Sequence, residues 1–209
     1  MDSSKRQDSN QMSTKVLRAI DGIRLPNEYR VLLRPGEIET DINGTAHRLP
    51  RFFYEIASWQ EAHEIRLVPH FTLAELMLVD CREAQLLLSQ FPHYVPCVIV
   101  LLARLLEDFR REVDAPVFIS ANGGYRSPAH QIGGVKSIHA WGTAANIYRV
   151  GDTFLSDARS IEKYRSIAAS LSPAVFVRSF GREQAQTDDH LHLDLGFVTL
   201  TPRECSEAI

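Results

Sequence analysis

The sequence predicts an α+β protein: a small antiparallel sheet flanked by helices, with a β-rich N-terminal extension. Two observations support this class. Helical apolar periodicity dominates residues 72–113, and short strand-like segments mixed with a helix follow it. The 209 residues are enough for one domain with a substantial core. We divide the chain into a disordered tail (1–14), an N-terminal extension (15–68) and a main domain (69–209).

The N-terminal part is predicted from composition and turn chemistry. Residues 1–14 are polar and are expected to be disordered. The run Tyr29–Leu33 has a strand-like composition, and Pro35-Gly36 follows it as a turn. Asn43-Gly44 is a second turn signal, typical of a hairpin. A β-rich extension is therefore expected.

Two helices begin the main domain. Thr72 and Glu75 have capping-box spacing, and apolar residues then recur with helical period to about Gln90. A second helix is predicted over Val98–Val113. Its apolar face is expected to hold Leu101, Leu102, Leu105, Leu106 and Phe109, and its polar face Glu107, Arg110 and Arg111.

Short strands then alternate with loops and one helix. The expected strands are 116–120, 145–150, 174–180 and 190–195, and the expected helix is 156–170. A glycine-containing loop, 122–128, follows the first of these strands.

Composition excludes several classes of function. The 23 Lys and Arg nearly balance the 26 Asp and Glu, so no broad field attracts nucleic acid or an anionic membrane. No run of about 18 apolar residues exists, so no membrane span is expected. The polar N-terminus does not resemble a secretory signal, which favours a cytoplasmic location. Three scattered cysteines suggest neither a disulfide framework nor a cysteine zinc site.

A histidine pair gives the first functional signal. His190, His192 and Asp194 alternate with leucines, so a strand would place these three on one face. Two imidazoles on one face, about 6–7 Å apart along the strand, can address one metal-sized site. The alternative is a solvent-exposed strand edge with ordinary polar alternation.

A second cluster leads to a family resemblance. The segment from Ser137 through His139 to Asn146 resembles the Ser-x-His-x-x-Gly-x-Ala-x-Asp motif of the zinc D-Ala-D-Ala carboxypeptidases and related peptidoglycan peptidases (peptidase family M15). Three other segments resemble that family in the same order: Phe71–Leu76 its helix opening, Gly124–Pro128 its Ser-Gly-Tyr-Arg-Ser-Pro loop, and His192–Asp194 its closing His-Val-Asp. The resemblance covers about residues 69–198.

The resemblance implies a fold, a cofactor and a set of roles. It implies a carboxypeptidase-like domain with zinc held by His139, position 146 and His192, and Asp189 as general base and acid. Arg126 would bind a substrate carboxylate, and Ser137 and Tyr125 would assist in substrate binding. His190 is placed to stabilise an oxyanion. Position 146 departs from the family, because Asn146 is neutral where the family has an aspartate.

Three functions are consistent with the sequence. The first is a zinc metallopeptidase, a carboxypeptidase-like hydrolase acting on peptidoglycan-type or D-Ala-containing peptides, or on another small peptide or amino-acid-like substrate with a carboxylate. The second is the same fold with a His-rich centre of His139, His190 and His192, joined by Asp189 or Asp194. That centre would suit iron or copper and a non-hydrolytic step in small-molecule biosynthesis. The third is a catalytically silent binding protein that keeps Arg126.

Overall fold

The computed structural model describes residues 17–41, 43–78, 93–181 and 188–205. It is a mixed structure of helices and small antiparallel sheets, which confirms the α+β class. The predicted tail lies outside the described residues, as does the stretch 79–92 into which the first predicted helix was to continue. The strands are β1 (Arg18–Asp21), β2 (Ile38–Thr40), β3 (Ala46–Arg48), β4 (Phe52–Glu55), β5 (Arg66–Val68), β6 (Phe71–Thr72), β7 (Tyr94–Pro96), β8 (Val117–Ile119), β9 (Ala144–Val150), β10 (Thr153–Phe154), β11 (Phe176–Val177) and β12 (Leu191–Asp194), and the α-helices are α1 (Asn27–Leu33), α2 (Trp59–Glu64), α3 (Leu73–Met77), α5 (Ile99–Val113) and α6 (Ala158–Leu171).

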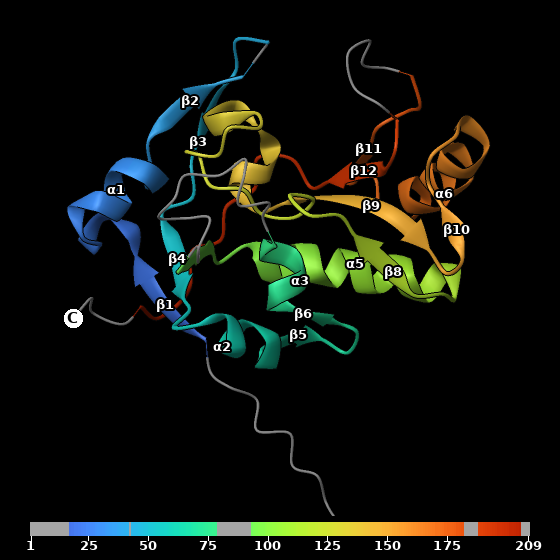
Figure 1. Ribbon diagram of the computed structural model, residues 1–209. Coiled ribbons are helices and arrows are strands. Elements are labelled where there is room, and N and C mark those ends of the chain that lie inside the picture. Colours follow the sequence, from blue (N-terminus) through green and yellow to red (C-terminus); the bar gives the residue numbers. More distant parts are fainter. Residues whose placement is uncertain (1–16, 42, 79–92, 182–187, 206–209) are drawn as a thin grey trace, which may run out of the picture.

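The largest sheet carries the candidate site. Its strands run in the order β10-β9-β12-β11, and β8 also pairs with β9. The helices α5 and α6 pack against it, with α5 lying along β9 in Figure 1. Apolar side chains of β9 and β12, such as Ile147, Leu191 and Leu193, join those of the two helices in the main core. The polar residues that alternate with them therefore lie on the opposite face of the sheet.

The helix α5 follows the predicted range, but two of its residues differ from the prediction in their burial. Leu102, Leu106 and Phe109 are fully buried, as expected from their spacing. Leu101 was predicted on the apolar face, but it is 39% exposed. Glu107 was predicted on the polar face, but it is only 8% exposed because it accepts hydrogen bonds from His70.

The predicted strand Tyr29–Leu33 is wrong, because this segment is the helix α1. Pro26 precedes the helix, where its missing N–H costs no hydrogen bond. Glu28 lies in the first turn, where a negative charge interacts favourably with the helix dipole. Arg34 ends the helix in a left-handed conformation, with φ of 51°. These end signals outweigh the strand-like composition of the interior.

The rest of the N-terminal region is built from small sheets. The strands β1 and β4 of this region form one antiparallel sheet with β7 of the main domain, and β2 and β3 form a hairpin around the predicted Asn43-Gly44 turn. Thr72 and Glu75 form the predicted capping box at the start of α3. The prediction of one continuous helix to about Gln90 is wrong, because α3 ends at Met77 and Leu78 is extended. No helix among the described residues is long and apolar enough to cross a membrane.

The Glu107–His70 contact gives a pH-dependent prediction. Burial opposes ionisation of Glu107, but hydrogen bonds from the ring and backbone N–H of His70 outweigh it and hold the pKa of the carboxyl below its usual value. A lowered carboxyl pKa stabilises the fold above the unfolded-state pKa, and this stabilisation disappears as the pH falls. We expect Glu107→Gln to lower the free energy of unfolding by about 1–2 kcal/mol at pH 7, and by much less near pH 3.

Urea denaturation across this pH range checks the expectation. Glu112→Gln, at an exposed position of the same helix, is the matched control and should change little at either pH. An equal loss for Glu107→Gln at both pH values would contradict the assignment.

Candidate functional site

Pairing between β9 and β12 brings two of the predicted site residues together. Asn146 and His192 are direct cross-strand partners in this antiparallel pair. The strand β12 lies between β9 and β11, and His192 is only 8% exposed. The alternative of a solvent-exposed strand edge is therefore wrong. A histidine this buried needs partners for both ring nitrogens.

Both nitrogens of His192 have a neighbour. Nε2 lies 3.0 Å from Asp194 Oδ2, and a carboxylate can only accept, so this nitrogen carries a proton. Nδ1 lies 2.8 Å from Asn146 Oδ1. In a neutral ring Nδ1 is an acceptor too, and two acceptors at this distance repel. The contact becomes favourable if His192 gains a second proton, if the amide turns over to donate its NH₂, or if both atoms face a cation.

His139 reaches the same place from a loop. It lies in the short 3₁₀ helix Ile138–Trp141, just before β9, and is almost fully buried. Its Nδ1 donates to the carbonyl oxygen of Gly124 at 2.8 Å, which leaves the lone pair on Nε2. Burial lowers the pKa of His139 well below its usual value, and the charge of Arg126 lowers it further. The ring is therefore neutral and able to act as a ligand.

Two glycines allow the loop after β8 to hold these groups. A Cβ on Gly124 would lie 2.1 Å from the carbonyl oxygen of Leu76 in α3. A Cβ on Gly123 would lie 2.8 Å from the carbonyl oxygen of Asn146. The carbonyl of Gly123 accepts from Asn146 N–H at 2.7 Å, and Tyr125 N–H donates to Leu76 at the same distance. The loop thus lies directly on β9 and α3, where no side chain fits.

The two histidines fit the geometry of a shared zinc ion. Two imidazole nitrogens bound tetrahedrally at about 2.0–2.1 Å from zinc place the ring centres roughly 5 Å apart. The ring centres of His139 and His192 are 5.3 Å apart. Each ring also has its remote nitrogen held, by a backbone carbonyl and by a carboxylate respectively, as metal-bound histidines usually do.

The residue available as a third zinc ligand is a weaker donor than the two histidines. Among the described residues, no group of three or more His, Cys, Asp or Glu side chains could hold a metal ion. The donors at this point are two neutral imidazoles and the side-chain amide of Asn146. An amide oxygen is a neutral ligand and does not compensate the charge of a dication. The residues fit zinc in position, but with a weaker donor set than two histidines and an aspartate.

The loop residues predicted to bind substrate lie in two environments. Arg126 adjoins the site, since its N–H donates to the carbonyl of His139 and its Nη2 lies 3.4 Å from Ser137 Oγ. Tyr125, in contrast, is 1% exposed and belongs to the main core. Its hydroxyl has no hydrogen-bond partner within the described part of the chain. This burial leaves Tyr125 no side-chain surface for a substrate.

A chain of contacts lies next to His192. His190 Nδ1 is 2.6 Å from Asp189 Oδ1, and His190 Nε2 is 2.8 Å from Arg178 Nη2. Arginine only donates, so Nε2 accepts and the ring proton lies on Nδ1, facing Asp189. The pKa of His190 lies below its usual value, because burial and the charge of Arg178 lower it more than the contact with Asp189 raises it.

Sequence reasoning missed Arg178. It follows β11, and its N–H donates to the carbonyl of His192. No motif marks this residue, and only the pairing of β11 with β12 brings it to the site.

The N-terminal region supports the loop that carries His139. Trp141 is buried with Leu49 and Ala140, and its Nε1 donates to the carbonyl of Arg48 at 2.9 Å. The ring of His47 stacks on Phe197 with centres 3.6 Å apart. The β2–β3 hairpin thus packs against the loop next to the candidate site (Figure 1).

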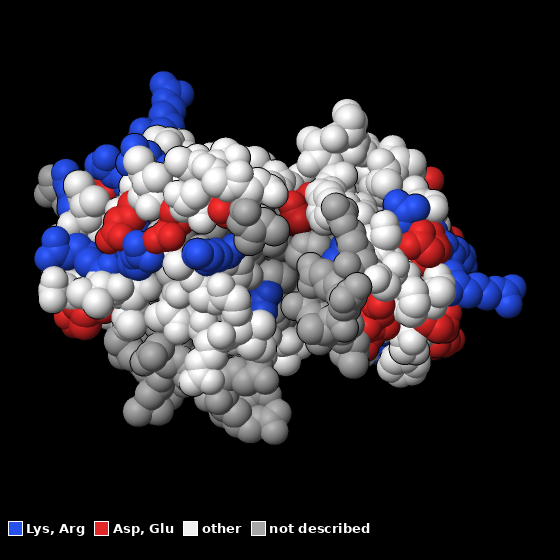
Figure 2. Space-filling model, turned by 90° about the horizontal axis from the view of Figure 1, so that it is seen from above, with Lys and Arg blue, Asp and Glu red and all other residues white. Residues whose placement is uncertain are grey.

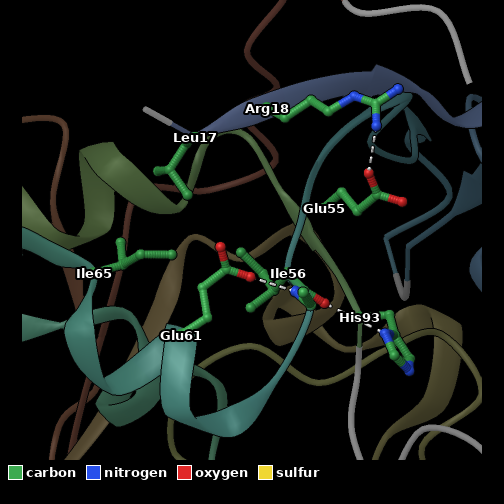
Figure 3. A pocket seen from close by; sticks show the side chains of 8 residues that line it. Leu17, Arg18, Glu55, Ile56, Glu61, Ile65 and His93 are labelled. Carbon is green, nitrogen blue, oxygen red and sulfur yellow. Dashed lines mark hydrogen bonds and ion pairs between the residues drawn. The ribbon is translucent and has the colours of Figure 1, made fainter. Parts of the chain in front are cut away.

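A cavity of about 270 Å³ lies elsewhere, between β1, β4 and α2 (Figure 3). None of the predicted site residues lines it. Its polar groups bond to one another or to backbone, as in the ion pair between Arg18 and Glu55 and the contact of His93 with the carbonyl of Ile56. Figure 2 shows positive and negative side chains interspersed over one face of the molecule, without a broad area of one sign.

Comparison of the chain with protein-family models, with curated proteins and with solved structures found no match.

Because Gly124 lies so close to α3, adding one methyl group at this position is expected to destabilise the fold strongly. We expect Gly124→Ala to lower the free energy of unfolding by more than about 2 kcal/mol, because the loop must move away from Leu76. Gly44→Ala is a useful comparison: its φ of 82° disfavours alanine, but its Cβ meets open space. It should cost only about 1 kcal/mol. Thermal and urea unfolding measure both, and equal losses would contradict the predicted contact.

Proposed function

We propose that the chain is a zinc-dependent, carboxypeptidase-like hydrolase of peptidoglycan-type or D-Ala-containing peptides. The observation that carries the proposal is the approach of His139 and His192 to 5.3 Å, each with its remote nitrogen held by a carbonyl or a carboxylate. The family resemblance selects the same two histidines independently. Zinc bound there would polarise a scissile carbonyl and lower the pKa of a bound water to about 7.

The protein groups around this position have distinct roles. Asp189 is exposed two residues before β12 begins, and its carboxylate would accept a proton from water and return it to the leaving amine. His190 orients this carboxylate through Nδ1–H. Because His190 Nε2 accepts from Arg178, the positive charge beside a developing oxyanion comes from Arg178 rather than from His190. Arg126 would bind the C-terminal carboxylate of the peptide with its planar guanidinium.

A binding protein without catalysis is the second candidate, and the Asn146–His192 contact favours it. If the Asn146 amide turns over, its NH₂ takes the place of Oδ1 beside Nδ1 and donates to it, which satisfies His192 without any cation. The His-rich centre for iron or copper has less support. Both nitrogens of His190 are engaged, so its use as a third ligand requires the contact with Arg178 or with Asp189 to break.

Zinc titration tests the proposal through residue 146. We expect the chain to bind one zinc ion, and Asn146→Asp to tighten binding at least about tenfold, because an anionic oxygen compensates the charge of the cation. Competition with a chromogenic chelator measures the affinity, and His192→Ala should abolish binding. Asn27→Asp, an exposed position in α1, makes the same chemical change far from the site and should have no effect.

Unchanged or weaker binding in Asn146→Asp would exclude residue 146 from the ligand set. Failure of the chain to bind zinc under any loading condition would overturn the hydrolase in favour of the binding protein. Release of D-Ala from a D-Ala-D-Ala peptide by the zinc-loaded chain supports the hydrolase directly.

The proposed role of Arg126 in binding the substrate carboxylate predicts that its substitution changes KM. We expect Arg126→Lys to raise KM for peptides with a free C-terminal carboxylate about tenfold, since lysine keeps the charge but loses the two-point hydrogen bonding. The kcat and the zinc content should stay close to those of the original chain. A peptide amide serves as the control substrate and should show no difference between the two proteins. An unaltered KM for the peptide with a free carboxylate would exclude Arg126 from carboxylate binding.

A further inference from the structure

The sheet continues beyond the candidate site into a cluster of aromatic side chains around one arginine. Arg149 lies three residues after Asn146 in β9, next to Phe118 of β8 on one side and Phe154 of β10 on the other. Its guanidinium lies 3.9 Å from the ring centre of Phe118, 5.6 Å from that of Phe154 and 6.0 Å from that of Tyr148. We call these four residues the arginine cluster.

The arginine cluster lies on the same face of the sheet as Asn146 and His192. Val117 and Ile119 of β8 pack into the main core with α5, so Phe118 between them faces the other way. The pairing of β8 with β9 shifts register between Phe118 and Ile119, a bulge that lets both Tyr148 and Arg149 lie outside the core. The cluster therefore continues the site face along β9.

Arg149 is a cation without an anionic partner among the described residues. No ion pair or hydrogen bond of its side chain is found there, and its Nε is buried with no acceptor. Phe118 covers the flat face of the guanidinium, and a planar anion such as a carboxylate would bind through the terminal N–H groups. Phe154 beside it is 59% exposed, so the cluster is open to solvent.

We propose that the arginine cluster is a subsite for a carboxylate on the amino-terminal side of an extended peptide substrate. This inference rests on the proposed function. Arg126 lies on the loop that leaves β8 beside Asn146, whereas Arg149 lies at the far end of β9, so the two arginines flank the histidine pair along the strand.

The spacing sets the position of the carboxylate in the peptide. Arg149 lies three positions after Asn146 in β9, which is at most about 10 Å along the strand because the bulge shortens this stretch. An extended peptide covers that distance in about three residues. The preferred substrate is therefore a peptide of at least four residues, with an acidic side chain about three residues before the scissile bond and a free C-terminal carboxylate, rather than a dipeptide.

Two peptides that differ only in charge test this subsite: acetyl-Glu-Ala-D-Ala-D-Ala and its Gln counterpart. Calorimetry gives their Kd values with the zinc-loaded chain, and D-Ala release gives kcat/KM. We expect about tenfold tighter binding and higher kcat/KM for the Glu peptide. Arg149→Gln should abolish this preference while binding the Gln peptide as before. Arg159→Gln, an exposed arginine of α6, is the matched control and should retain the preference.

The outcomes separate the subsite from the hydrolase. A Glu preference that persists in Arg149→Gln overturns the subsite, and so does an equal loss of binding for both peptides. Hydrolysis of both peptides without a preference also overturns it but leaves the hydrolase standing. An Arg149-dependent preference in binding without any hydrolysis supports the subsite and overturns the hydrolase. If Arg149→Gln does not fold, Phe154→Ala decides: a reduced preference supports the subsite, and an unchanged one overturns it.

Discussion

The candidate site depends on the way the loop after β8 lies directly on β9. Hydrogen bonds from Asn146 N–H to Gly123 and from the His139 ring to Gly124 hold strand, loop and histidine in one arrangement. Because the loop backbone fills the space between β9 and α3, the positions of both glycines exclude any side chain. The orientation of His139, and through it the geometry of the histidine pair, follows from this packing.

The chemistry of the site is set by one neutral residue. With an aspartate at position 146, the anionic oxygen would require a cation or a protonated His192 beside it. With Asn146, the amide can serve as a weak oxygen ligand or as a hydrogen-bond donor to the same ring nitrogen. The same framework is therefore compatible with the proposed metal centre or with a metal-free hydrogen bond between Asn146 and His192. The difference in free energy between the two depends on how strongly the two histidines attract the ion.

The sequence predicted those features that depend on local chemistry. The capping box at Thr72, the helix α5 and the alternation in β12 follow from spacing within a few residues. The helix α1 was missed because its interior has strand-like residues, whereas its ends, at Pro26 and Arg34, determine the conformation. Glu107 was misplaced because its burial depends on His70, 37 residues away, a contact that helical periodicity does not contain.

Within the candidate site, the family resemblance selected His139, Asn146 and His192, which the structure places together. Arg178 and the arginine cluster were not predicted, because they reach the site face only through the pairing of β8, β10, β11 and their neighbours. Strand register is a long-range property, and the spacing of residues along one segment does not determine it.

X-ray absorption at the zinc edge of the metal-loaded chain measures whether His139 and His192 bind the same cation. We expect outer-shell scattering from two imidazole rings, with zinc–nitrogen distances of about 2.0–2.1 Å. A spectrum with one imidazole or none would contradict it.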